Sequence, residues 1–138
     1  MTTIDTKGFI YELNDAGLAV ESGDAMTEHS IDGMIPEVVV YPADLRELSI
    51  AMEAAYRKNV VVAPWGGGTR IALGNTIECL CAVVDVSLLD RVVEHNPADL
   101  TATIQAGVKL DNFQRVLDKH GQFLALDPPL PHRTTLGG

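Results

Sequence analysis

Two β-branched runs separated by a helical stretch constrain the fold of this chain more than any other feature. Residues 36–41 and 59–63 are rich in valine, which favours short buried strands. Between them, Asp44 opens a stretch with apolar residues at helical spacing, and Asn59 suits a left-handed helix cap. The predicted apolar stripe of this helix is Leu45, Leu48, Met52, Ala55 and Tyr56. A strand, a helix and a strand at this spacing predict two parallel strands joined by a right-handed crossover.

The second strand leads into three consecutive glycines, within the sequence Pro64-Trp65-Gly66-Gly67-Gly68-Thr69. Residues without a Cβ atom can adopt positive φ and let a ligand approach the main chain, so that amide N–H groups converge on an anion. Open α/β sheets bind their ligands at the carboxyl ends of the strands, where this loop is expected to lie. The loop is therefore a candidate phosphate cradle. The alternative is a tight surface turn, because glycine clusters also mark turns.

Two familiar phosphate-binding motifs are excluded by inspection. A P-loop requires a lysine near its end, and no lysine lies between Lys58 and Lys109. A dinucleotide fingerprint requires a glycine where Ile71 stands and a helix after it, whereas the residues after Gly74 lead towards another strand. A phosphate site here would depend on main-chain amides, with Arg70 as a nearby cation.

Composition excludes several classes of partner. The 138 residues have a net charge of −9, whereas nucleic-acid binders normally present a basic patch. No apolar run reaches the roughly 18 residues of a membrane span, and residues 1–5 lack a signal-peptide pattern, so the expected location is the cytoplasm. Cys79 and Cys81 are expected to be buried thiols on one strand face, because no further metal-ligand motif accompanies them.

The rest of the chain predicts alternating short elements. These are a helix at 4–16 ended by Gly17, an irregular segment at 18–33 with room for a short strand at 18–20, a strand at 80–86, a hairpin of 91–95 with 100–106, and a helix at 108–120. The prolines at 128, 129 and 131 exclude a central strand near the end, since they remove hydrogen-bond donors.

A series of short motifs resembles one family. The motifs are Pro64-Trp65-Gly66-Gly67-Gly68-Thr69 with Gly74, Val84-Asp85-Val86-Ser87, Glu94-His95-Asn96-Pro97-Ala98-Asp99-Leu100-Thr101, Gln105-Ala106-Gly107, Leu126-Asp127-Pro128-Pro129 and Thr135-Leu136-Gly137-Gly138. In this order they resemble the FAD-linked oxidases of the vanillyl-alcohol oxidase and p-cresol methylhydroxylase superfamily, and most of all the FAD-binding subunit of bacterial glycolate oxidase. The resemblance covers residues 36–138, after an N-terminal helix and irregular lead-in at 1–35.

The resemblance implies an α+β fold and two groups of cofactor-binding residues. The fold would be a two-part FAD-binding domain, with a small parallel βαβ subdomain followed by an antiparallel-strand subdomain that is incomplete. The rest of the FAD-binding domain and the substrate domain would be absent. Main-chain amides of the glycine loop would wrap the FAD pyrophosphate, and the residues implied there are Pro64, Trp65, Gly66, Gly67, Gly68, Thr69, Leu73 and Gly74. The residues implied near the flavin and its ribityl chain are Pro128, Pro129, Thr135, Leu136, Gly137 and Gly138. For both groups, the alternative is a loop that only shapes the chain.

One departure from the family pattern bears on how FAD is held. Members that attach FAD covalently through this loop have a histidine where Thr69 stands, so FAD is expected to be non-covalent here. All four histidines are expected to be surface or loop residues, with His132 the only one near the flavin. Asp85, Asp99 and Asp127 are expected to cap turns or strand ends. No residue is assigned as catalytic or as a metal ligand.

The function implied by the resemblance is that of the FAD-binding portion of a flavin-dependent oxidoreductase, which oxidises a 2-hydroxy acid such as glycolate within a larger protein or complex. The alternative is a non-catalytic nucleotide-binding or interaction module of a multi-subunit complex. Partner subunits or self-association are expected, because sheet edges left open pair with other strands. The change Gly67→Val is expected to block the cradle with little loss of fold.

Overall fold

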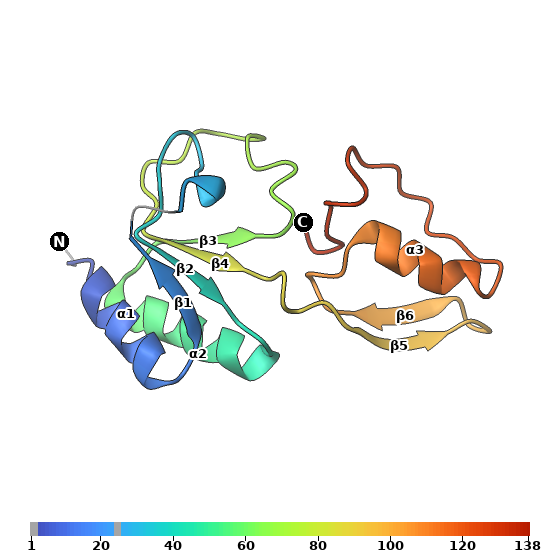
Figure 1. Cartoon of the computed structure of the whole chain (residues 1–138), viewed down its shortest axis with the longest axis horizontal. Coiled ribbons are helices and arrows are strands. Elements are labelled where there is room, and N and C mark those ends of the chain that lie inside the picture. The colour runs from blue at the N-terminus through green and yellow to red at the C-terminus, as the bar shows by residue number, and fades with distance from the viewer. Residues whose placement is uncertain (1–2, 24–25) are drawn as a thin grey trace.

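The computed structural model describes residues 3–23 and 26–138, which form two sheets with their own helices (Figure 1). The elements in chain order are α1 (Thr6–Asp15), β1 (Ala19–Ser22), the short 3₁₀ helix η1 (Met26–His29), β2 (Val38–Tyr41), α2 (Leu45–Lys58), β3 (Val62–Trp65), β4 (Ala82–Asp85), β5 (Val92–Asn96), β6 (Thr101–Ile104) and α3 (Leu110–Asp118). The predicted α+β class is confirmed.

The first sheet has the strand order β1-β2-β4-β3. Strands β2 and β3 both run parallel to β4, so the predicted parallel strands are confirmed, with β4 between them. Strand β1 pairs with β2 antiparallel and forms one edge. Strand β3 forms the other edge, and this position suits Pro64, because a proline has no N–H to donate to a further strand.

Alternating valines divide the core of this sheet between its two faces. Val38 and Val40 of β2 are fully buried against Phe9 and Leu13 of α1, on the face that α1 and α2 cover (Figure 1). Val39 points to the opposite face, where it packs in a cluster with Met26 and Trp65. Because side chains alternate along a strand, one short valine run supplies both cores.

Helix α2 has the predicted ends but only part of the predicted buried face. The Asp44 side chain accepts a hydrogen bond from the Glu47 N–H at 2.8 Å, and Asn59 adopts φ 55° as a left-handed cap. The buried residues are Ala51, Ala54 and Ala55. Of the predicted stripe, Ala55 is buried and Leu48 packs against the core, whereas the larger residues Leu45, Met52 and Tyr56 are exposed, so the stripe is wrong for these three. Alanine lets the helix lie close to α1 and the sheet, and this outweighs the burial of larger side chains.

The second sheet consists of the antiparallel strands β5 and β6, with α3 against them (Figure 1). The predicted hairpin is confirmed. Val108, Phe113 and Leu117 form its core together with Val92 and Ile104. Close backbone contacts hold the junction between the sheets: the Gly107 N–H donates to the Leu89 carbonyl at 2.8 Å, and the Gly137 N–H donates to the Ala106 carbonyl at 2.9 Å.

The two cysteines differ in burial. Cys81 is buried, whereas Cys79 is exposed, so the expectation of two buried thiols is wrong for Cys79. Strand β4 begins only at Ala82, and both cysteines therefore lie in the segment before it. Among residues 3–23 and 26–138, no helix has the length and apolar character needed to cross a membrane.

Candidate functional site

The glycine loop leaves the first sheet at the end of β3 and returns to it at β4. Gly68 adopts φ +64° and Gly74 adopts φ +107°, a region that side chains with a Cβ atom disfavour. The loop therefore connects strand to strand, as predicted, and within the described residues no helix follows β3 before β4. An anion bound here would depend on the backbone amides.

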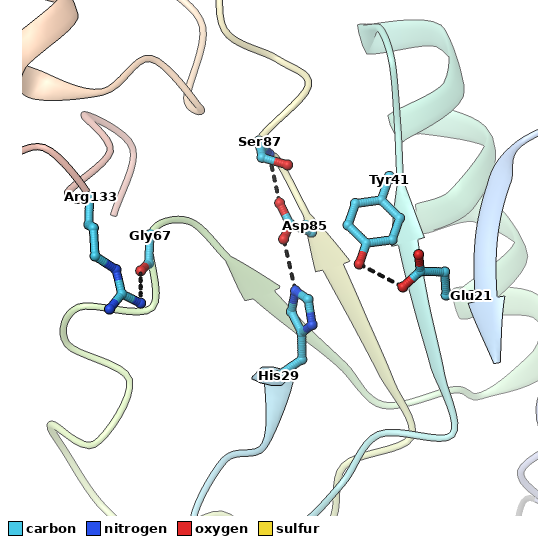
Figure 2. A network of polar contacts seen from close by, with 7 residues as sticks. All are labelled: Glu21, His29, Tyr41, Gly67, Asp85, Ser87 and Arg133. Atoms are coloured by element: carbon cyan, nitrogen blue, oxygen red, sulfur yellow. Dashed lines mark hydrogen bonds and ion pairs between the residues drawn. The ribbon is translucent and has the colours of Figure 1, made fainter. Parts of the chain in front are cut away.

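Residues 133–138 pack directly against this loop. The Thr69 and Thr134 hydroxyl oxygens lie 3.3 Å apart. The Arg133 guanidinium donates to the Gly67 carbonyl at 3.4 Å (Figure 2). These pairs are 65 and 66 residues apart in sequence. The structure thus brings together the two groups of residues that the resemblance implied, one from each sheet region.

The contact at Gly67 is too close for any side chain. A Cβ atom added to Gly67 would lie 1.9 Å from the Arg133 carbonyl oxygen, which belongs to the main chain. A substitution would therefore push the two segments apart. The expectation that Gly67→Val leaves the fold almost intact is wrong, because this glycine is required by protein packing as well as by any ligand.

Two adjoining cavities lie along this contact. One of about 150 Å³ is lined by Pro64, Gly66, Gly67, Gly68, Thr69, Arg70, Ile71, Thr135 and Gly138. The other, of about 190 Å³, is lined by Arg70, Leu110, Leu126, Asp127, Pro128, Thr134, Thr135, Leu136 and Gly138. Arg70, Thr135 and Gly138 line both cavities, so the two form one continuous candidate site.

Five of the predicted site residues line neither cavity: Trp65, Leu73, Gly74, Pro129 and Gly137. Leu73 is exposed on the loop. The Pro129 carbonyl accepts a hydrogen bond from the Thr134 hydroxyl at 2.9 Å. A Cβ atom on Gly137 would lie 2.6 Å from that of Ala106, so Gly137 allows the last turn to approach the segment that follows β6. Pro129 and Gly137 thus hold the last turn in place from outside the cavities.

The Thr135 hydroxyl is the one buried side-chain polar atom of the described residues that has no hydrogen-bond partner. Thr135 is 4% exposed, and its oxygen faces the glycine loop: a Cβ atom on Gly66 would lie 2.3 Å from it. A buried hydroxyl without a partner costs about 1–3 kcal/mol. Thr135 lines both cavities, so its hydroxyl is a candidate hydrogen-bond partner for a ligand held there.

Two arginines offset the acidic character of the chain at this position. Arg70 lines both cavities, and Arg133 reaches the Gly67 carbonyl from the opposite segment. With a net charge of −9, the chain repels anions at long range, so local cations are needed to hold one. Arg70 could be predicted from its place in the loop, whereas Arg133 could not, because its contact joins residues 66 apart in sequence.

A polar network lies beside the loop at the carboxyl ends of the first sheet (Figure 2). Asp85 of β4 accepts hydrogen bonds from the Ser87 N–H at 2.8 Å, as a strand-end cap, and from His29 Nε2 at 2.9 Å. The His29 ring packs on the Trp65 indole, with centroids 4.9 Å apart. The expectation that His29 is a plain surface or loop residue is therefore wrong, because it joins a network around a buried carboxylate.

Tyr41 closes this network on the side of β2. Its hydroxyl donates to the Glu21 carboxylate at 3.0 Å, and its ring meets the His29 ring edge-on (Figure 2). Burial, together with the Glu21 carboxylate, raises the pKa of Tyr41 to about 12, so the phenol stays neutral at physiological pH. Within the described part of the chain, no three histidine, cysteine or acidic side chains gather in a way that could hold a metal ion.

Comparison with known proteins identifies relatives of this arrangement. The chain matches the family described as "FAD binding domain" over residues 36–138. It is 27% identical over 128 residues to the glycolate oxidase subunit GlcD of Bacillus subtilis. This alignment covers 93% of this chain and 27% of the relative. It is 28% identical over 144 residues to D-2-hydroxyglutarate dehydrogenase of Escherichia coli, covering 94% of this chain and 14% of the relative.

A third relative is the mitochondrial D-lactate dehydrogenase [cytochrome] of Kluyveromyces lactis, 27% identical over 106 residues, covering 74% of this chain and 18% of the relative. The chain thus spans less than a third of the length of these relatives. Among solved structures, alkyldihydroxyacetonephosphate synthase superimposes with a TM-score of 0.81 at 24% identity, covering 99% of this chain and 32% of that structure, and it shows the shared fold. The chain belongs, over residues 36–138, to the FAD-binding domain family of the FAD-linked oxidases.

Proposed function

We propose that this chain is the FAD-holding part of a flavin-dependent oxidoreductase that oxidises a 2-hydroxy acid such as glycolate. The observation that carries the proposal is the unpartnered Thr135 hydroxyl, buried where the glycine loop meets residues 133–138. The names of three relatives support the substrate class, because glycolate, D-lactate and D-2-hydroxyglutarate are all 2-hydroxy acids. Residues 36–138 would form the N-terminal portion of the FAD-binding domain, preceded by the lead-in at 1–35.

The residues present fit a dinucleotide with a diphosphate at its centre. The glycine loop offers backbone amides, and the missing Cβ atom at Gly66 lets the loop pack directly against the Thr135 hydroxyl. Arg70 and Arg133 place two cations beside the loop. In this proposal Pro64, Gly66, Gly67, Gly68 and Thr69 surround the pyrophosphate, while Pro128, Thr135, Leu136 and Gly138 line the path towards the flavin.

The five predicted residues outside the cavities take supporting roles in this proposal. Trp65, Leu73, Gly74, Pro129 and Gly137 shape the loop and the last turn without lining the cavity. When bound, FAD supplies a two-electron acceptor, and the protein supplies its grip and orientation. No acid or base is assigned to this chain for the reaction.

Thr69 bears on how FAD is attached. Its hydroxyl lies 3.3 Å from that of Thr134, and it has no nitrogen that could bond to the flavin. We propose that FAD is held here without a covalent bond to this loop. Acid precipitation of the loaded protein tests this: the yellow colour is expected in the supernatant, and colour that stays with the pellet would contradict it.

The experiment that tests FAD binding is an absorbance spectrum of the purified chain, taken before and after incubation with excess FAD and desalting. The flavin bands are expected to remain with the protein. A Cβ atom on Gly66 would lie 2.3 Å from the Thr135 hydroxyl oxygen, so Gly66→Val is expected to separate the loop from residues 133–138 and to abolish the retained bands. The change His120→Ala, an exposed residue in the second sheet region, serves as the control and should leave them unchanged.

A colourless wild type would contradict the proposed function and favour the alternative, a non-catalytic interaction module.

Self-association is proposed as well. The apolar cavity of about 340 Å³ beside α3, with the exposed Leu100 and Phe123 at its margin, offers a surface for it. The β3 edge is less suitable, because Pro64 lacks an N–H to donate. Light scattering is expected to show dimers or larger species, and a monomer at high concentration would contradict this.

A further inference from the structure

A chain of contacts connects a buried carboxylate to the glycine loop. Its first link is Asp85, which is 6% exposed and sits at the end of β4. The carboxylate is fixed on both sides, since one oxygen accepts from the Ser87 N–H and the other bonds to His29 Nε2. A buried carboxylate with two such partners has one favoured orientation, and it therefore holds the His29 ring in one position.

The second link is the contact between His29 and Trp65 (Figure 2 shows His29 beside Asp85). Their ring centroids lie 4.9 Å apart at an angle of 53°. Tyr41 meets the other side of the imidazole edge-on, with centroids 6.0 Å apart. The imidazole thus lies between two aromatic rings, so its place is set by packing as well as by its hydrogen bond.

The third link joins Trp65 to the loop. A Cβ atom added to Gly68 would lie 2.6 Å from Cζ2 of the indole, so the ring packs against the Gly68 main chain. Gly68 is also the residue at which the loop turns with φ +64°. The indole therefore supports the loop at the residue whose backbone conformation aims the neighbouring amides.

From these three links we infer that His29 is a positioning residue for the cofactor loop: anchored on Asp85, it holds Trp65 against Gly68 and so sets the conformation of the cradle. His29 belongs to η1, which precedes the family match at 36–138. The lead-in segment thus contributes a residue that positions the cofactor loop. The effect on FAD affinity rests on the proposed function, whereas the effect on the loop does not.

The test compares His29→Ala with a variant that loses stability elsewhere. Leu13→Ala is the matched control, because Leu13 is fully buried in α1 on the opposite face of the first sheet. His29→Gln is the second variant: it retains an N–H donor for Asp85 and removes the ring that contacts Trp65. It is expected to fold even where His29→Ala does not.

Three readouts are measured in the whole chain. Trp65 is its only tryptophan, so fluorescence reports on the indole alone. In both His29 variants the emission is expected to shift to longer wavelength, and hydrogen exchange at residues 66–69 should become faster. The FAD dissociation constant should rise about tenfold, the factor expected from the loss of about 1.4 kcal/mol of preorganisation. Leu13→Ala should lower the melting temperature without these changes.

The inference is overturned if the His29 variants keep wild-type emission and wild-type exchange in the loop. It is overturned equally if Leu13→Ala changes the loop by the same amount, since His29 would then act only through global stability. If the wild-type chain binds no FAD, the proposed function fails, and the fluorescence and exchange measurements still decide the role of His29.

Discussion

Thr135→Val should change stability and FAD affinity in opposite directions. The Thr135 hydroxyl is buried without a partner among the described residues, and valine replaces it with a methyl group of similar shape. Removing an unsatisfied buried hydroxyl is worth about 1 kcal/mol or slightly more, which corresponds to a rise in melting temperature of roughly 3–5 °C for a domain of this size. FAD affinity should fall about 2–10-fold, because one hydrogen bond to the ligand is lost.

The neighbouring residue provides a matched control for this prediction. Thr134 is 8% exposed, close to the 4% of Thr135, but its hydroxyl donates to the Pro129 carbonyl at 2.9 Å. Thr134→Val should therefore destabilise the chain by about 1 kcal/mol. Calorimetry without cofactor and fluorescence titration with FAD measure both effects. The reasoning is refuted if the two valine variants destabilise the chain equally, since the Thr135 hydroxyl must then have a partner.

Three further predictions test other parts of the site. Gly67→Ala should lower the free energy of unfolding by roughly 1–3 kcal/mol, because its Cβ atom meets the Arg133 carbonyl; an unchanged urea midpoint would contradict this. Arg133→Ala should weaken FAD binding about tenfold and reduce its salt dependence, which titrations at two ionic strengths measure. The raised pKa of Tyr41 stabilises the fold below pH 10.0, and this contribution disappears as pH rises to about 12; Tyr41→Phe should lose less stability over that range, as urea unfolding at each pH will show.

Local sequence signals predicted the elements of the first sheet well. The ends of α2 follow from Asp44 and Asn59, whose capping roles depend only on nearby backbone groups. The buried face of α2 was predicted correctly at Leu48 and Ala55 but wrongly at Leu45, Met52 and Tyr56, because hydrophobicity favours large side chains whereas close packing of a helix favours alanine. Cys79 was placed in the core because it and Cys81 were expected to share one face of a strand, whereas β4 begins only at Ala82.

The candidate site divides in the same way between local and distant interactions. The glycine loop could be located from its own residues, because strand and glycines are adjacent in sequence. Its contact with residues 133–138 was reached only through the family resemblance, since no pattern in one sequence pairs Gly67 with Arg133. The His29–Asp85 bond joins residues 56 apart and was missed altogether, because neither residue lies in a motif that names the other.

The meeting of the glycine loop with residues 133–138 also bears on when the site can exist during synthesis. One wall of the cavity leaves the ribosome about 65 residues before the other, as the separation of Thr69 and Thr134 shows. Until residues 133–138 have been synthesised, Gly67 cannot contact the Arg133 carbonyl, and the loop lacks the segment against which it packs. A cofactor bound there would contact both the glycine loop and residues 133–138, so that binding requires both regions to have folded.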